Sequence, residues 1–283
     1  GASTQAEMRD PLYDAEPQIN PFVNWTPKFL MNKRSPRTST NAQKLTVLTF
    51  SSDGYRLQGT LHLPDGPHPN LIVGSHGLYS SGDSPKQSEL AGCCCQLGLA
   101  YFRFDHRGCG RSEGHFERVT TLAGRRNDLV DAVAFLRAEF NLGPKLGLFG
   151  SSLGGATCLA AAHILAPFRV VTLAAPVDSH SVLTATAKHE APVPPLFFKD
   201  AFQFDLRHDI AAITGLFVIH GDGDDVIPPS HAEIIFEHVR DPKKLHFVSG
   251  GDHRLSRRDH QQRFMNETLD WFKPLTKHPP GGR

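Results

Sequence analysis

The stretch Lys145–Leu159, KLGLFGSSLGGATCL, decides the fold that we expect for this chain. Its first half is a short apolar run that predicts a strand, and its second half opens an Ala- and Leu-rich run that predicts a helix. Between them, the small residues of Gly150-Ser-Ser152-Leu-Gly154 allow the backbone to bend sharply. A strand, sharp turn and helix in this order are typical of a nucleophile elbow, so Ser152 is the candidate nucleophile.

The same five-residue pattern occurs a second time, as Gly110-Arg-Ser112-Glu-Gly114. This copy follows the polar loop Asp105-His-Arg-Gly-Cys and runs into Gly-His-Phe-Glu, which is not a helix-forming segment. A nucleophile elbow requires a strand before the serine and a helix after it. The context therefore favours Ser152 over Ser112.

Composition indicates a globular protein that is large enough for one domain with a sizeable core, since 39% of the 283 residues are hydrophobic. The 30 basic and 29 acidic residues are mixed along the chain and leave a net charge of +1, which argues against nucleic acid or a membrane surface as a partner. No apolar run approaches the roughly 20 residues of a membrane span. Without a signal-peptide pattern at the N-terminus, we expect a cytoplasmic protein.

The five cysteines are odd in number, and three of them are adjacent, at Cys93 to Cys95. This spacing suits neither a disulfide framework nor a metal cluster. We expect reduced thiols that pack as small hydrophobic residues in a helix.

Three parts of the chain are expected. Residues 1–43, rich in Pro, Asn, Ser and Thr, predict an extended N-terminal arm, and residues 277–283 form a tail. The main domain spans residues 44–276 and opens with a predicted antiparallel hairpin of Leu45–Phe50 and Tyr55–Leu63.

After the hairpin, short apolar runs alternate with helical patterns, which predicts an α/β fold: a mostly parallel sheet with helices on both faces. The predicted strands are Leu71–Ser75, Ala100–Asp105, Leu146–Phe149, Val170–Ala174, Leu216–His220 and Leu245–Val248. The predicted helices are Ser84–Leu97, Leu122–Phe140, Ser152–Leu165, His231–Val239 and Arg257–Phe272. Ligand chemistry in such sheets gathers at the carboxyl ends of the strands.

The segment from Ser179 to Thr214 interrupts this alternation with three prolines followed by several phenylalanines. It lies between two strands whose carboxyl ends are expected to flank Ser152, which suggests a small cap over the site. On this hypothesis Phe198 and Phe202 are substrate-binding candidates. Core packing is the other interpretation of such an aromatic stretch.

A serine nucleophile needs an imidazole to accept its proton and a carboxylate to orient that imidazole. The candidate acid is Asp224, in the turn VIHGDGDDVIPP after one strand, where Asp222 and Asp225 compete with it. The candidate base is His253, in FVSGGDHRL after another strand. Asp252, beside it, is interpreted as a turn-forming residue.

The elbow at Ser152, His76-Gly77, Gly221-Asp-Gly-Asp224-Asp-Val-Ile-Pro228 and Gly251-Asp-His253 together resemble the α/β-hydrolase superfamily, whose members carry Ser, Asp and His in this chain order. The resemblance covers about Leu45 to Phe272 and is closest to carboxylesterases, cinnamoyl or feruloyl esterases and serine-aminopeptidase-like hydrolases.

The resemblance also bears on the individual residues of the site. It places the acid four residues before Pro228, at Asp224, with Asp178 as the alternative, and it implies structural roles for His76 and His220. An oxyanion hole needs two donors, and the residue after the nucleophile, Leu153, is expected to give one backbone amide. The resemblance assigns the other to the amide of Leu78.

The resulting hypothesis is a serine hydrolase, carboxylesterase-like, that cleaves small-molecule carboxylic esters through an acyl-enzyme, with apolar or aromatic acyl groups and without a metal or other cofactor. A peptidase, lipase or thioesterase could use the same triad, because all of these reactions are acyl transfers. A binding protein with this fold and no chemistry is the alternative from another class, and the presence of all three triad residue types argues against it.

Overall fold

The computed structural model describes residues 43–180, 182 and 202–276 of the chain. The predicted arm (apart from Gln43), the predicted tail and much of the predicted cap, Phe198 included, lie outside the described residues.

The described residues contain one eight-stranded sheet, which opens with the expected hairpin. Strands β1 and β2 pair in antiparallel register around Asp53 and Gly54, both of which have a positive φ. Two-residue turns of this kind match the twist of the flanking strands. The strands are β1 (Lys44–Ser52), β2 (Tyr55–Leu63), β3 (Leu71–Ser75), β4 (Ala100–Phe104), β5 (Leu146–Ser151), β6 (Arg169–Leu173), β7 (Leu216–Gly221) and β8 (Lys243–Val248).

The strand order is β1-β2-β4-β3-β5-β6-β7-β8. The β1/β2 and β2/β4 pairs are antiparallel, and every pair from β4 through β3 to β8 is parallel. The predicted mostly parallel sheet is therefore confirmed. The parallel strands from β3 to β7 are largely buried on both faces, which explains their mostly apolar sequences, whereas the edge strand β8 is only partly buried.

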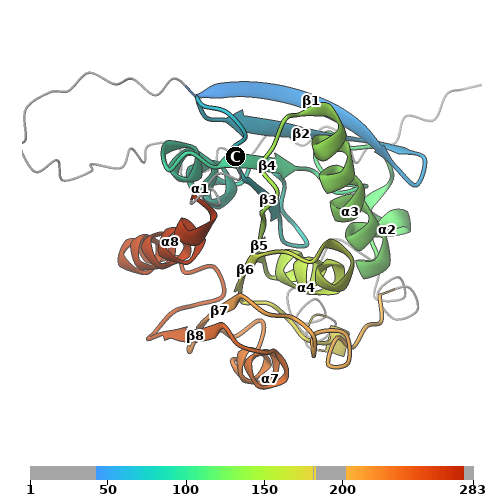
Figure 1. The fold of residues 1–283 in the computed structure, drawn as a ribbon. Helices are drawn as coiled ribbons and strands as arrows, with labels where there is room; N and C mark the ends of the chain where they lie inside the picture. The colour runs from blue at the N-terminus through green and yellow to red at the C-terminus, as the bar shows by residue number, and fades with distance from the viewer. Residues whose placement is uncertain (1–42, 181, 183–201, 277–283) are drawn as a thin grey trace, which may run out of the picture. The chain divides into compact units, whose positions relative to one another are not determined.

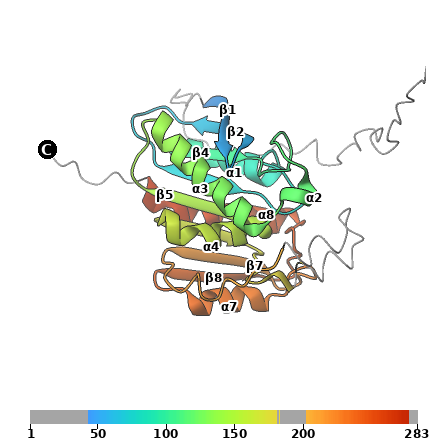
Figure 2. The same ribbon diagram turned by 90° about the vertical axis from the view of Figure 1, so that its right-hand side faces the viewer.

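Helices cover both faces of the sheet, as predicted. Figure 1 shows α1 and α8 on one side and α3, α4 and α7 on the other, and Figure 2 looks onto the face covered by α3 and α4. Each face has its own cluster of buried apolar side chains. The helices are α1 (Pro85–Gln96), α2 (Phe116–Val119), α3 (Leu122–Glu139), α4 (Leu153–Leu165), α7 (Ser230–His238) and α8 (Arg258–Phe272), followed by a 3₁₀ turn (Lys273–Leu275).

The parallel strands bring segments that are far apart in the sequence to one edge of the sheet. Ser75 at the end of β3 pairs with Gly150 of β5, and Gly221 at the end of β7 pairs with Val248 of β8. The loops that follow these strands carry Leu78, Ser152, Asp224 and His253. This register places all of the predicted catalytic residues at the carboxyl edge of one sheet.

Candidate active site

Ser152 lies on a strained turn between β5 and α4. Its φ of 52° and ψ of −126° fall outside the regions that a non-glycine residue normally adopts. The flanking glycines make this turn possible by allowing close backbone contact. A Cβ at Gly154 would lie 2.1 Å from the Ser75 oxygen, and one at Gly150 would lie 2.2 Å from the Gly154 oxygen.

Ser152, His253 and Asp224 form a continuous chain of hydrogen-bond contacts. The Nε2 atom of His253 lies 3.1 Å from Ser152 Oγ, and its Nδ1 atom lies 2.8 Å from Asp224 Oδ2. Both distances are within hydrogen-bond range. Ser152 follows β5, Asp224 follows β7 and His253 follows β8.

Asp224 is held as a carboxylate by several donors. Its Oδ1 accepts hydrogen bonds from the Val226 and Ile227 amides at 2.9 and 2.8 Å. Its Oδ2 also lies 3.1 Å from Nε2 of the fully buried His220. Burial alone would raise the pKa of Asp224, but the bonds from His220, His253 and Ile227 outweigh it and hold the pKa below its usual range.

Three other carboxylates, those of Asp178, Asp222 and Asp252, have different partners. Asp178 pairs with Arg207 at 2.8 Å, and Asp222 accepts a bond from the Gly250 amide at 2.6 Å. Asp252 accepts a bond from the Ser256 amide at 2.6 Å, as expected of a turn-forming residue. Asp224 is the carboxylate that contacts His253.

The two segments with the predicted oxyanion donors lie against the elbow. Leu153 is the first residue of α4, where free amides and the helix dipole favour negative charge. Gly77, which precedes Leu78, approaches the elbow so closely that a Cβ on it would lie 3.6 Å from Ser152 Cβ. The roles of Leu78 and Leu153 as donors stay predictions.

A network of buried polar groups lies behind the loop that carries Leu78. His106 contacts Ser75 Oγ through Nε2 at 2.8 Å and Asp128 through Nδ1 at 3.3 Å. Asp128 in turn accepts a bond from Arg107 Nε at 2.8 Å. Sequence reasoning did not single out this network, or the fully buried Arg125 beside it. The signal for Arg125 was available, because it stands three residues after Leu122 and four before Leu129 on the apolar face of α3.

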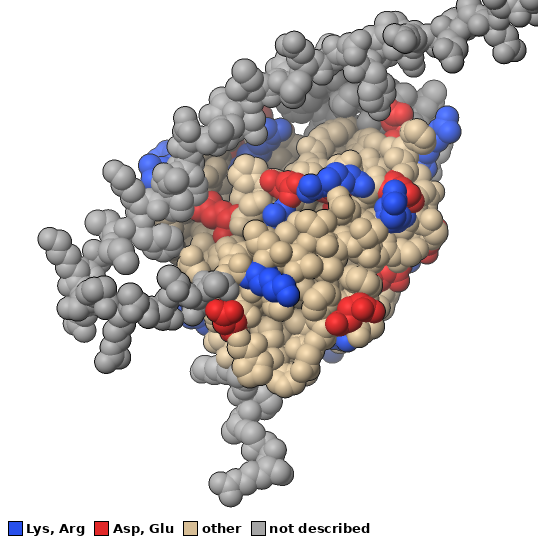
Figure 3. Space-filling model, turned by 90° about the horizontal axis from the view of Figure 1, so that it is seen from above, with Lys and Arg blue, Asp and Glu red and all other residues tan. Residues whose placement is uncertain are grey.

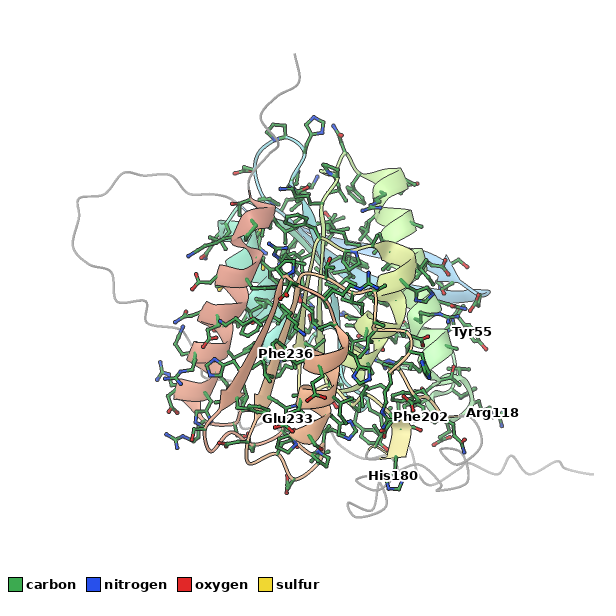
Figure 4. The ribbon with its side chains drawn as sticks, turned by 60° about the horizontal axis from the view of Figure 1, so that its bottom comes forward. Tyr55, Arg118, His180, Phe202, Glu233 and Phe236 are labelled. Atoms are coloured by element: carbon green, nitrogen blue, oxygen red, sulfur yellow. The ribbon has the colours of Figure 1, made fainter. Side chains whose placement is uncertain are left out.

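Phe202, one of the two substrate-binding candidates, is only 1% exposed and belongs to the hydrophobic core. Its ring packs edge-on against Phe204, and Figure 4 shows it at the same end of the fold as His180. The structure thus gives Phe202 the core-packing role that was the other interpretation of this stretch. Phe198 lies outside the described residues.

The described residues contain no group of His, Cys, Asp or Glu side chains arranged to hold a metal ion. All five cysteines are free, and burial raises the pKa of each thiol. None of the described helices combines the length and the apolar character that crossing a membrane requires. Over the described part of the face seen in Figure 3, acidic and basic side chains are interspersed, so this face offers no concentrated charge of one sign.

Comparison of the sequence with family models finds a match to the α/β hydrolase fold over residues 70–224. An uncharacterized protein of Escherichia coli K12, YfhR, is 30% identical over 211 residues, which cover 72% of this chain and 71% of YfhR. Mouse palmitoyl-protein thioesterase ABHD10, a mitochondrial protein, is 26% identical over 219 residues, covering 67% of this chain and 70% of the relative.

Solved structures with the same fold include an esterase of Pyrococcus furiosus, Pf2001, with a TM-score of 0.71 and 17% identity over 86% of this chain and 97% of that one. Est1E of Butyrivibrio proteoclasticus, solved with bound ferulic acid, has a TM-score of 0.65 and 16% identity over 79% of this chain and 99% of its own. At these identities the likeness concerns the fold alone.

Proposed function

This chain belongs to the α/β-hydrolase fold family, and we propose that it is a serine hydrolase that cleaves carboxylic esters of small molecules through an acyl-enzyme. Membership of the family and the esterases among its structural neighbours support a hydrolase. The serine mechanism is supported by one observation above all, the contacts that run from Ser152 Oγ through His253 to Asp224.

In the first half of the proposed reaction, Ser152 Oγ attacks the ester carbonyl while His253 Nε2 accepts the hydroxyl proton. The resulting imidazolium is stabilised by Asp224, which stays ionised because its pKa is low. The Leu78 and Leu153 amides stabilise the oxyanion of the tetrahedral intermediate. When the intermediate collapses, the bond to the alcohol oxygen breaks, and His253 returns its proton to the leaving alcohol.

In the second half, a water molecule attacks the acyl-enzyme and gives its proton to His253. Collapse of the second tetrahedral intermediate releases the carboxylic acid and returns the proton to Ser152 Oγ. The cycle consumes one water and uses no redox step, so the triad and the two amides suffice for it.

A test of this proposal combines ester turnover with labelling of the serine. We expect hydrolysis of p-nitrophenyl esters of graded acyl length, and covalent labelling of Ser152 by a fluorophosphonate that Ser152→Ala abolishes. A non-catalytic binding protein of the same fold would show neither. Absence of both signals in the wild-type protein would therefore refute the hydrolase proposal.

A second candidate function is the hydrolysis of thioesters in place of esters, which the similarity to a palmitoyl-protein thioesterase favours. Esters and thioesters of the same acyl chain, compared as pairs, distinguish the two activities through the ratio of kcat/KM. Lipase and peptidase activities use the same machinery and are tested alongside with long-chain glycerides and aminoacyl amides.

A preference for apolar or aromatic acyl groups remains part of the proposal, but it cannot rest on direct contact with Phe202, because that ring is buried in the core. Phe198→Ala is the informative variant. If Phe198 contacts the acyl group, this change raises KM for aryl esters more than for acetate esters. An equal effect on both would count against the aromatic preference.

A further inference from the structure

Among the described residues, Arg125, on the second turn of α3, is the largest fully buried side chain that carries a charge. None of the described carboxylates forms an ion pair with it within 4.0 Å. Burying a cation without a paired anion is unfavourable unless its hydrogen bonds compensate. The partners of this guanidinium are therefore informative.

On one side, Arg125 holds the loop that carries Leu78. Its Nη2 donates to the carbonyl oxygen of His76, the residue before Gly77. On the other side, its Nε lies 3.4 Å from Thr157 Oγ1, whose hydroxyl donates to the Leu153 carbonyl at 2.8 Å. One buried side chain thus connects the two backbone segments with the predicted oxyanion donors.

We propose that Arg125 is a positioning residue that fixes the loop of Leu78 and the first turn of α4 relative to each other, and so preorganises the oxyanion hole. This inference rests on the proposed serine-hydrolase function. It concerns the orientation of the two amides, because Arg125 itself lies behind them and does not contact substrate.

The ring of His76, whose carbonyl Arg125 holds, fixes the peptide group between Gly77 and Leu78. The His76 Nε2 atom accepts a bond from the His106 amide at 3.1 Å, so the proton of a neutral ring is on Nδ1. That Nδ1–H donates to the Gly77 oxygen at 2.7 Å. In a trans peptide the N–H points opposite to the C=O, so this bond fixes the direction of the Leu78 N–H.

The neutral form of His76 is maintained by its surroundings. Burial is the main cause that holds the pKa of His76 well below its usual range, and the charge of Arg125 is the next. Arg125 therefore fixes the His76 carbonyl directly and helps to keep the ring neutral, while the bond from the His106 amide sets the tautomer. Loss of Arg125 would release the His76 carbonyl and remove one of the two causes that keep the ring neutral.

The test compares Arg125→Met and Arg125→Lys with Arg126→Met, a matched control on the same helix whose guanidinium contacts the neighbouring Asn127. We expect Arg125→Met to lower kcat by about 10- to 100-fold, somewhat less than direct removal of an oxyanion donor. KM stays within about twofold, because ground-state binding is unaffected. Arg125→Lys recovers part of the loss, and Arg126→Met retains wild-type kcat.

Two further measurements separate positioning from general damage to the fold. Rates are normalised to the amount of enzyme that a fluorophosphonate titrates at Ser152, so unfolded protein is not counted. The affinity of an alkylboronic acid, which forms a tetrahedral adduct on the serine, is expected to fall in parallel with kcat. If Arg125→Met does not fold, Arg125→Lys and Thr157→Val test the positioning role instead. Each of them is expected to lower kcat several-fold.

The proposal is overturned if kcat of Arg125→Met, or of both replacement variants, stays within twofold of wild type after normalisation. It is also overturned if boronate affinity does not change while kcat falls. Failure of the hydrolase proposal looks different, because the wild-type protein would then neither turn over esters nor become labelled at Ser152.

Discussion

Two turns of this chain share the pattern Gly-x-Ser-x-Gly, one around Ser112 and one around Ser152, and their surroundings make them different. The Ser112 hydroxyl donates to the Asp105 carbonyl at 2.6 Å and accepts a bond from the Gln58 amide at 3.0 Å. The Ser152 hydroxyl contacts His253, which in turn contacts a carboxylate. The first serine stabilises a loop, and the second is available for chemistry.

The glycines of the two turns have different tasks as well. A Cβ at Gly110 would lie 2.2 Å from the Asp105 carboxylate, whereas one at Gly154 would lie 2.1 Å from the backbone of β3. Gly110 thus leaves room for the Asp105 carboxylate within the loop. Gly154 leaves room for α4 to begin directly against the sheet. A short pattern of small residues acquires its function from what it packs against.

Replacing each of the two serines by alanine gives the largest expected difference in kcat. Ser152→Ala should lower kcat for a p-nitrophenyl ester by about 10⁶-fold, the scale for loss of a triad serine. Ser112→Ala should keep kcat and lower the free energy of unfolding by about 1 kcal/mol, since hydrogen bonds are lost. Steady-state kinetics and urea unfolding measure the two effects. Comparable losses of kcat in both variants would remove the distinction between the turns.

The carboxylate that serves the Ser152 turn gives the next contrast. Asp224→Asn should lower kcat by about 10⁴-fold, because an amide favours the wrong tautomer of His253. Asp178→Asn, which weakens the ion pair with Arg207, is the matched control and should leave kcat within about threefold. Pre-steady-state acylation rates locate the defect. A larger loss of kcat for Asp178→Asn than for Asp224→Asn would indicate that Asp178, not Asp224, is the carboxylate that serves His253.

The close packing beneath the Ser152 turn is tested by adding one methyl group. Gly154→Ala should lower the free energy of unfolding by about 3 kcal/mol, because its Cβ would overlap backbone atoms of β3. Gly92→Ala, in the middle of α1 with no atom within 4 Å of its added Cβ, should instead raise it by about 1 kcal/mol. Chemical denaturation measures both changes. The same sign for both variants would contradict this account of the elbow.

The smallest expected effect concerns Asp128. Its carboxylate accepts hydrogen bonds from the amide and the Nε of Arg107, at the start of the loop that carries Ser112. Burial alone would raise the pKa of Asp128, but hydrogen bonds from His106 and Arg107 lower it from 3.8 to about 2. The folded state thus binds the proton less readily than the unfolded state. Ionised Asp128 stabilises the fold by about 2 kcal/mol above pH 4, and this contribution is lost as the pH falls towards 2.

Urea unfolding of the wild-type protein and Asp128→Asn at several pH values checks this prediction. The difference between the two proteins should narrow as the pH falls below 4. Asp131→Asn, on the same helix, is the matched variant for the loss of one carboxylate. A difference that is constant from pH 7 to pH 3 would show that Asp128 acts by packing alone.

Much of the fold could be predicted from the sequence because its strands are short apolar runs with turn residues on either side. The predicted ends of β3 agree with the structure, and those of β6 differ by one residue at each end. The single-turn helix α2 was missed, since four residues cannot show a helical period. Hydrophobic patterning therefore predicts the layers, and short local elements escape it.

For the site, the sequence indicated the three residues that contact one another, since each follows a strand of the same sheet. It could not indicate what lies behind them. The resemblance implied structural roles for His76 and His220 but not their partners, and the bond from Arg125 to His76 joins residues 49 positions apart. Such contacts depend on tertiary packing, which no local pattern encodes.

The backbone strain at Ser152 has a consequence for engineering this protein towards heat resistance. A residue with φ of 52° and ψ of −126° lowers the stability of the fold by about 1 to 3 kcal/mol. Glycine at this position would relieve the strain and remove the reactive hydroxyl in the same step. Thermostable variants that keep the hydroxyl must therefore gain their stability elsewhere in the molecule, and the elbow limits how far sequence optimisation can go.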